Sequence, residues 1–89
     1  MSEEQILHTA IRTFGAEAQK VVAIEECAEL AQAITHELRG REHNVPEEIA
    51  DVEICIAQMK MIYGCTDEVE RIKKQKLGRL YERIFEKCL

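Results

Sequence analysis

The sequence has no tryptophan, a single proline, two tyrosines and two phenylalanines. Because proline is the residue that breaks helix interiors, its scarcity leaves almost the whole chain free to form helices. No apolar run is long enough to span a bilayer, and the N-terminal stretch "MSEEQILHTA" is acidic where a secretory signal is basic and then hydrophobic. We therefore expect a cytoplasmic protein that does not insert into membranes.

The four cysteines form no C-x-x-C pair, and two of them fall within apolar helical stripes, so we expect reduced thiols. Positive charge is also scarce: 12 Lys and Arg stand against 17 Asp and Glu, a net charge of −5. Nucleic-acid binders usually present net positive surfaces, so the balance argues against a nucleic acid as the partner. The acidic excess needs another explanation.

What the chain does have is 46% apolar and 33% charged residues, the composition of a folded protein. Its 89 residues predict one domain covering positions 1–89. A chain this short builds a small core, which is often completed by a partner subunit. We therefore expect a homo-oligomer.

The order of caps, breaks and apolar stripes predicts four helices and no strand, since no segment alternates with period two over a useful length. The expected fold is all-α, a compact four-helix bundle. The predicted helices run from a cap at Ser2 to about Phe14 before Gly15, from Ala16 to Leu38, from Pro46 to Tyr63 before Gly64, and from a cap at Thr66 almost to Leu89.

Acidic residues interrupt the apolar faces of the second and third predicted helices. Within "VVAIEECAELAQAI", Glu26 and Glu29 lie inside or at the margin of the apolar arc, and on the next helix Glu48 lies in its middle and Asp51 at its edge. Each pair is spaced i, i+3, and a short loop makes the two helices antiparallel neighbours. Four carboxylates can therefore converge.

Four anions in a partly apolar site need compensation by protons or cations. Carboxylate oxygens favour hard divalent ions, and no histidine stands three residues after a glutamate as in di-iron bundles. We predict Mg²⁺, with Mn²⁺ as a substitute. Without these four residues the 17 acids fall to 13, against 12 bases, so the site would account for most of the net charge. The alternative is that each pair simply lies on a solvated helix face, as a single E-x-x-E usually does.

Two lysines interrupt the apolar arc of the last predicted helix, Lys73 and Lys76. Near a Mg²⁺ site they favour a ligand that carries phosphates, such as a nucleotide. The alternative is that they snorkel, with stems on the core and charged heads in water. Candidates to line a base pocket are His8, Phe14, Gln19 and Tyr63, although core packing is the default for the aromatics.

The residues "EECAE", a spacer of eighteen residues and "EIAD" resemble the E-E-x-x-E, spacer, E-x-x-D signature of the MazG-like all-α NTP pyrophosphohydrolases. The chain also resembles short members of that family in a Gln and Lys before the motif, "RG" in the loop, "EEIADV", and spaced Lys and Arg in the last helix. The likeness runs from about Gly15 to Ile84. It implies a MazG fold of helices with a core completed by oligomerisation.

The resemblance also implies a reaction: Mg²⁺-dependent hydrolysis of a nucleoside triphosphate between the α and β phosphates, giving a monophosphate and pyrophosphate. It implies Glu25 and Glu29 as catalytic, with Glu25 orienting or deprotonating the attacking water. The metal ligands would be Glu26, Glu29, Glu48 and Asp51, and Gln19, Lys73 and Lys76 would bind substrate, the lysines matching the family only loosely.

The family forms dimers, often paired into tetramers, and the resemblance extends that expectation to this chain. It leaves the preferred base and sugar open, because the chain lacks the tryptophan and long insertions of larger members. The alternative from another class is a non-enzymatic helical oligomerisation or nucleotide-sensing module that retains the metal site.

Overall fold

The computed structural model describes residues 1–88 as four α-helices, and this part of the chain contains no strand, which confirms the all-α class. The helices are α1 (Glu3–Phe14), α2 (Ala16–Leu38), α3 (Val45–Tyr63) and α4 (Thr66–Cys88). All four predicted segments are present, with boundaries within about one residue of those expected from the caps and breaks.

Local capping chemistry sets the start of α1 and the end of α3. At the start of α1 the Ser2 hydroxyl accepts from the Gln5 backbone N–H at 3.1 Å while the Gln5 side-chain oxygen accepts from the Ser2 N–H at 2.8 Å, a capping box. Gly64 ends α3 in the left-handed region at φ 59°, which glycine adopts without a Cβ clash. Thr66 is the first residue of α4 instead of its cap, because the Val69 N–H bonds to the carbonyl of Cys65.

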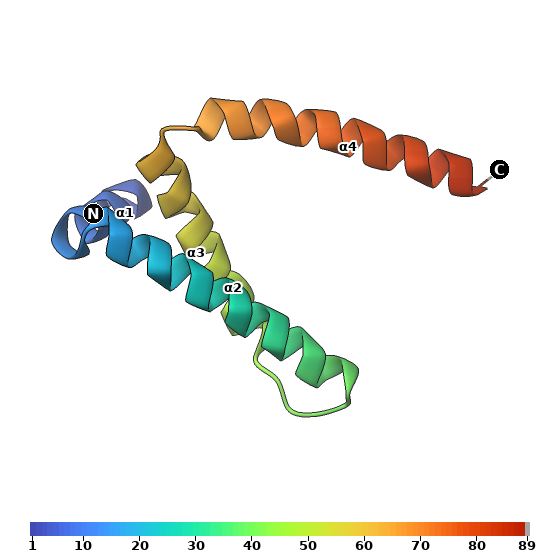
Figure 1. Ribbon diagram of the computed structural model, residues 1–89, viewed down its shortest axis with the longest axis horizontal. Coiled ribbons are helices and arrows are strands. Elements are labelled where there is room, and N and C mark those ends of the chain that lie inside the picture. The colour runs from blue at the N-terminus through green and yellow to red at the C-terminus, as the bar shows by residue number, and fades with distance from the viewer. Residues whose placement is uncertain (89) are drawn as a thin grey trace.

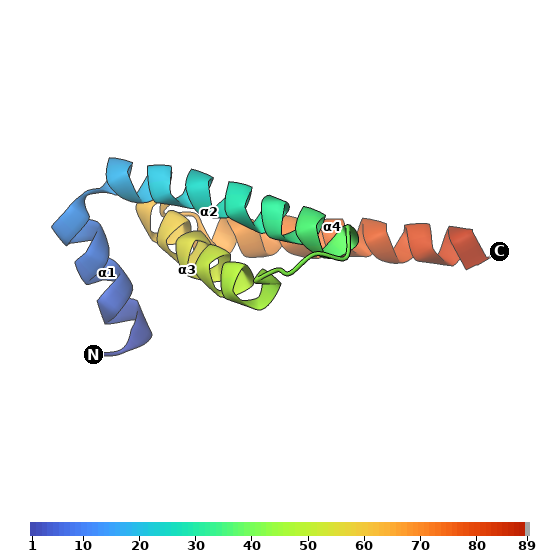
Figure 2. The same cartoon turned by 90° about the horizontal axis from the view of Figure 1, so that it is seen from below.

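The long helices α2 and α3 form an antiparallel pair, which carries the candidate site (Figures 1 and 2). Helix α1 packs across one end of this pair. The buried apolar residues all come from these three helices. They are few, and most of them are small: Leu7, Ala23, Ala33 and Cys55. Burial raises the pKa of the Cys55 thiol, and all four cysteines are free in this structure. Their reduced state stays a prediction.

Helix α4 does not complete the compact bundle that the sequence predicted. Figure 1 shows it running away from the other three helices, and within residues 1–88 it contacts only α3. None of its residues is buried, and the side chains of Leu80, Ile84 and Phe85 are about half exposed or more. The prediction of a compact bundle within one chain is therefore wrong, because within residues 1–88 helix α4 packs only against α3 and its apolar side chains stay exposed.

The extended shape leaves a large surface exposed. The chain measures 52 × 37 × 23 Å and exposes 7216 Å². A compact monomer of this size exposes roughly 5,300 Å² by the usual scaling with mass. The excess over a compact monomer is close to the area that one subunit buries in an extensive subunit interface.

Candidate metal centre

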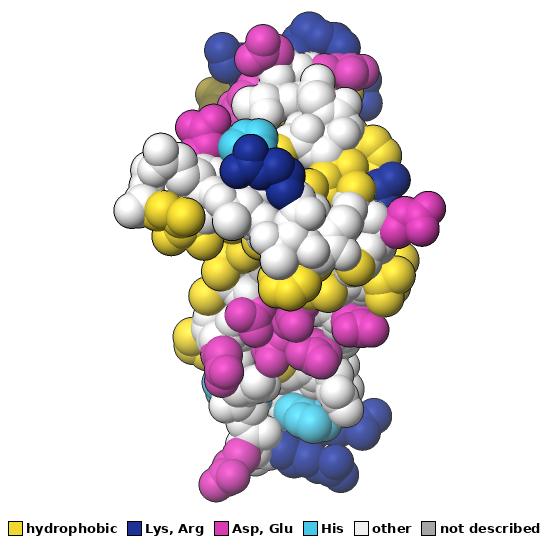
Figure 3. Space-filling model, turned by 90° about the vertical axis from the view of Figure 1, so that its left-hand side faces the viewer, with side chains coloured by type: hydrophobic (Ala, Val, Ile, Leu, Met, Phe, Trp, Pro, Cys, Tyr) yellow, Lys and Arg dark blue, Asp and Glu magenta, His cyan; other side chains and the backbone are white. Residues whose placement is uncertain are grey.

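Three carboxylates from two helices meet on the α2–α3 pair. One oxygen each of Glu26, Glu29 and Glu48 lies within 4.8 Å of the others. Glu26 and Glu29 are one turn apart on α2, and the antiparallel α3 brings Glu48 against them. Acidic side chains also gather on the face of the molecule shown in Figure 3. The predicted convergence of the two acid pairs is therefore present for three of the four residues.

Asp51, the fourth predicted ligand, is outside this group but near it. It follows Glu48 by one turn on α3 and is half-buried. Its negative charge is one of the causes that raise the pKa of Glu26. The structure thus places Asp51 beside the three converging carboxylates, without bringing an oxygen into the same small cluster.

Glu48 is the most constrained member of the cluster. It is only 6% exposed, and its Oε1 accepts a hydrogen bond of 2.7 Å from the side-chain amide of Asn44. Its Oε2 is buried and has no hydrogen-bond partner, and the same holds for Oε2 of Glu26. A buried polar atom without a partner costs roughly 1–3 kcal/mol. Two such oxygens, contributed by both halves of the motif, fit a bound cation.

The electrostatics of Glu26 agree with this geometry. Its pKa is raised from the ordinary value of 4.5 to about 7, first by burial of the carboxyl and then by the negative charges of Glu29 and Asp51. A hydrogen bond with Glu48 contributes as well. That bond requires a proton on Glu26, and with both groups ionised neither oxygen has a donor. The site therefore attracts positive charge, either a proton or a metal ion.

Comparisons of the chain with protein-family models, with curated proteins and with solved structures found no match. The choice of metal ion therefore rests on the chemistry of the ligand atoms. Carboxylate oxygens without a Cys or His donor suit a hard divalent ion such as Mg²⁺ or Mn²⁺.

Within residues 1–88, no helix combines the length and the apolar composition that a membrane-spanning segment requires.

Two other predicted site residues lie on α2, at different distances from the cluster. Glu25 is adjacent to Glu26 in the chain but exposed, and it is not one of the three converging carboxylates. Gln19 is 9% exposed and precedes Glu26 by two helical turns, about 10 Å along the axis. Both share the helix that carries the cluster, and neither is a member of it.

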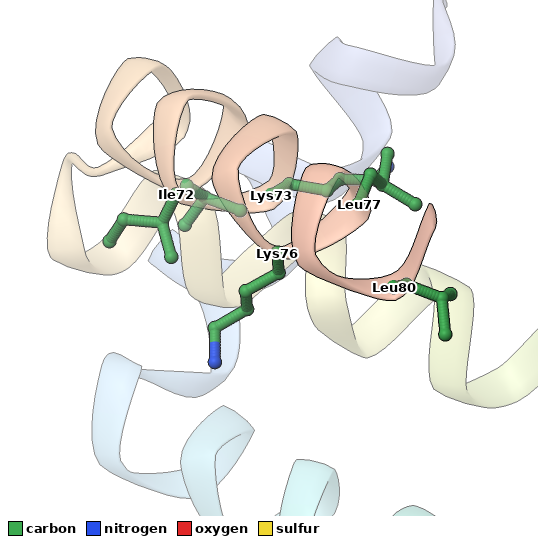
Figure 4. Close-up of a pocket in the computed structure, with 6 residues that line it drawn as sticks. Ile72, Lys73, Lys76, Leu77 and Leu80 are labelled. Atoms are coloured by element: carbon green, nitrogen blue, oxygen red, sulfur yellow. The ribbon is translucent and has the colours of Figure 1, made fainter. Parts of the chain in front are cut away.

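The two predicted phosphate-binding lysines lie away from the acids within one chain. Lys73 and Lys76 are on α4, which makes no contact with α2 in the part of the chain described. Their stems line a shallow groove of about 380 Å³ with apolar residues of the same helix, as Figure 4 shows for Ile72, Leu77 and Leu80. The exposed charged ends and apolar stems are the arrangement expected of snorkelling lysines.

Three of the candidate residues of a base pocket, His8, Phe14 and Tyr63, are exposed. His8 lies on α1 with its imidazole 3.9 Å from Glu4, and Phe14 is 66% exposed at the end of that helix. Tyr63, at the end of α3, is 61% exposed and lies under the ammonium of Lys20, 4.7 Å from the ring centroid. The expectation that the aromatics pack in the core is wrong for both, because each ends a helix and faces outward.

Asn44 is the neighbour of the cluster that the apolar periodicity missed. It belongs to the polar loop "RGREHN" between α2 and α3, where no helical stripe assigns a direction to a side chain. The available signal was its position four residues before Glu48, at the N-terminal boundary of a helix. Side chains at that spacing are neighbours once the helix forms.

Proposed function

We propose that this chain is a Mg²⁺-dependent nucleoside triphosphate pyrophosphohydrolase of the MazG-like kind. The observation that carries the proposal is the pair of buried, unpartnered oxygens, Oε2 of Glu26 and Oε2 of Glu48, one from each half of the double acid motif. A structural carboxylate of this burial normally has hydrogen-bond donors for its oxygens. The lack of donors at both is what a site built for a cation would show.

In this proposal Glu26, Glu29 and Glu48 hold the metal ion and Asp51 completes or orients the set. When bound, Mg²⁺ or Mn²⁺ supplies positive charge that offsets the charge of the phosphates and of the departing pyrophosphate. Glu25 is exposed and adjacent to Glu26 in the chain, and in this proposal its carboxylate orients or deprotonates the attacking water. Glu29 would both hold the metal and contribute to catalysis. Gln19, two turns earlier on α2, would contact the substrate.

We propose further that a second copy of the chain completes the active unit, as a dimer or a pair of dimers. Helix α4 carries seven basic and five acidic side chains, with three of the acids before Arg71, whereas residues 1–65 carry twelve acids and five bases. The exposed apolar side chains of α4 and its positive charge therefore complement the acidic remainder of another copy. Such packing would bring Lys73 and Lys76 of one subunit toward the acids of the other, where they would bind phosphates.

The test is product analysis with purified protein and a panel of ribo- and deoxynucleoside triphosphates, since substrate choice is open. We expect pyrophosphate and a nucleoside monophosphate from at least one member in the presence of Mg²⁺, and none once EDTA is added. Orthophosphate as the first product, or activity that EDTA leaves unchanged, would contradict the proposal. The proposed function includes a cytoplasmic location, where nucleoside triphosphates occur.

The rival function is a helical oligomerisation or nucleotide-sensing module. The separation of Lys73 and Lys76 from the acids within one chain favours it, since no phosphate site is assembled there. The same panel separates the two functions when nucleotide binding is also measured. Nucleotide binding that depends on Mg²⁺, with no turnover of any triphosphate, would establish the sensor.

A further inference from the structure

Asn44, the last residue before α3, contacts the candidate metal centre through its side chain. Its amide Nδ2 donates a hydrogen bond of 2.7 Å to Oε1 of Glu48, one turn into the helix. With Glu26 ionised, this is the only side-chain hydrogen bond made to the three clustered glutamates within residues 1–88. Asn44 therefore controls the environment of one of the two oxygens of Glu48.

The contact is not a by-product of helix capping. Asparagine at this position usually accepts a hydrogen bond from the second or third helical N–H through its side-chain oxygen. Here Asn44 makes no such cap. The first helical N–H, that of Val45, bonds instead to Nδ1 of His43 at 3.3 Å, and Pro46 has no N–H to satisfy. The amide of Asn44 donates to the carboxylate of Glu48 instead of taking part in a cap.

The hydrogen bond makes the two oxygens of Glu48 different. Oε1 accepts from Asn44, whereas Oε2 is buried without a partner, as is Oε2 of Glu26. Two like-charged carboxylates repel, so an unrestrained Glu48 would rotate away from Glu26 when no cation is bound. A donor that holds one oxygen keeps the other in place.

We propose that Asn44 is a positioning residue, which fixes the Glu48 carboxylate so that Oε2 is ready to bind a divalent cation. This inference rests on the proposed metal site and adds to it a residue outside the double acid motif. Residues that hydrogen-bond to metal ligands restrict the orientation of those ligands, and their loss typically weakens metal binding by about 10- to 100-fold. Asn44 acts through Glu48 and has no contact with substrate in this scheme.

The test is a calorimetric titration of the protein with MgCl₂ alone, comparing wild type with Asn44→Ser. Serine keeps a good residue at the helix boundary but is too short to reach Glu48, so we expect an unchanged helix content. We expect the dissociation constant for Mg²⁺ to rise by about 10-fold or more. The matched control is His43→Ala, which removes the adjacent hydrogen bond at the same helix end and should leave Mg²⁺ affinity within about twofold of wild type.

Each outcome decides the matter. If wild type binds Mg²⁺ and Asn44→Ser binds it equally well, the role of Asn44 is overturned while the metal site stands. Equal weakening by Asn44→Ser and His43→Ala would also overturn it, because the loss would then reflect the start of α3 in general. If wild type binds no Mg²⁺, the metal site fails, and the positioning role fails with it.

Discussion

Replacing Glu48 by glutamine should make the metal-free protein more stable while removing its response to Mg²⁺. The substitution keeps the size of the side chain, and its oxygen can still accept the hydrogen bond from Asn44. The new NH₂ group takes the place of Oε2, the buried oxygen without a donor. It can donate to Glu26, whose Oε2 is also unpartnered, so a repulsive contact becomes a hydrogen bond.

The expected size follows from the burial of Glu48. An unsatisfied buried polar atom costs roughly 1–3 kcal/mol, which the amide would relieve. For a domain of this size 1 kcal/mol shifts the melting temperature by roughly 4–8 °C, so metal-free Glu48→Gln should melt at least about 4 °C above wild type. Mg²⁺ at 100 times its dissociation constant should add roughly 2.7 kcal/mol to wild type. Glu48→Gln should lose most of that increment.

The assay is a set of thermal melts of both proteins, in EDTA and across a Mg²⁺ titration, at fixed ionic strength, pH and protein concentration. Glu47→Gln is the matched control, because it removes one negative charge from the same helical turn at an exposed position. It should leave the Mg²⁺ response intact. A metal-free Glu48→Gln protein clearly less stable than wild type, or an undiminished Mg²⁺ response, would show that Glu48 is a structural acid and refute the reasoning.

Three further predictions concern catalysis, substrate and pH. Glu29→Gln should lower the rate of pyrophosphate release by roughly two orders of magnitude, whereas the exposed control Glu37→Gln should change it little; equal losses would mean that general acidity had been mistaken for a site. Lys73→Ala or Lys76→Ala should raise the apparent KM for the nucleotide with the helix content unchanged, and unaltered kinetics would leave only the snorkelling role. Because the pKa of Glu26 is raised from 4.5 to about 7, the folded protein holds a proton in that window that the unfolded chain has lost. Its contribution to metal-free stability should therefore decline as the pH rises through the window, and melts of Glu26→Gln should lack this component of the pH dependence.

The sequence predicts the helices well because the signals that bound them are local. The Ser2 capping box, Pro46 in the first turn of α3 and Gly64 after its last turn act within a few residues, so they can be recognised without the fold. The proximity of Glu26 and Glu48 can be predicted from the sequence nearly as well. The prediction requires only helical spacing and the antiparallel arrangement that a short loop imposes.

The position of α4 and the role of Asn44 lie beyond such signals. An apolar arc containing Leu77 and Ile84 shows that a helix needs a partner, but it does not specify whether the same chain supplies that partner. Asn44 lies in a loop, where no periodicity assigns a direction to its side chain. The exposure of Tyr63 is similar, since an aromatic residue at a helix end fits a core or a surface equally well from the sequence.

The most direct test of the metal site is the anomalous diffraction of Mn²⁺ in a crystal grown with Mn²⁺ and a non-hydrolysable nucleoside triphosphate analogue. We predict an anomalous peak bounded by carboxylate oxygens of Glu26, Glu29 and Glu48, with a phosphate oxygen of the analogue also bound to the ion. A wild-type crystal with the analogue bound and no peak between α2 and α3, or with the ion held by other residues, would contradict the account.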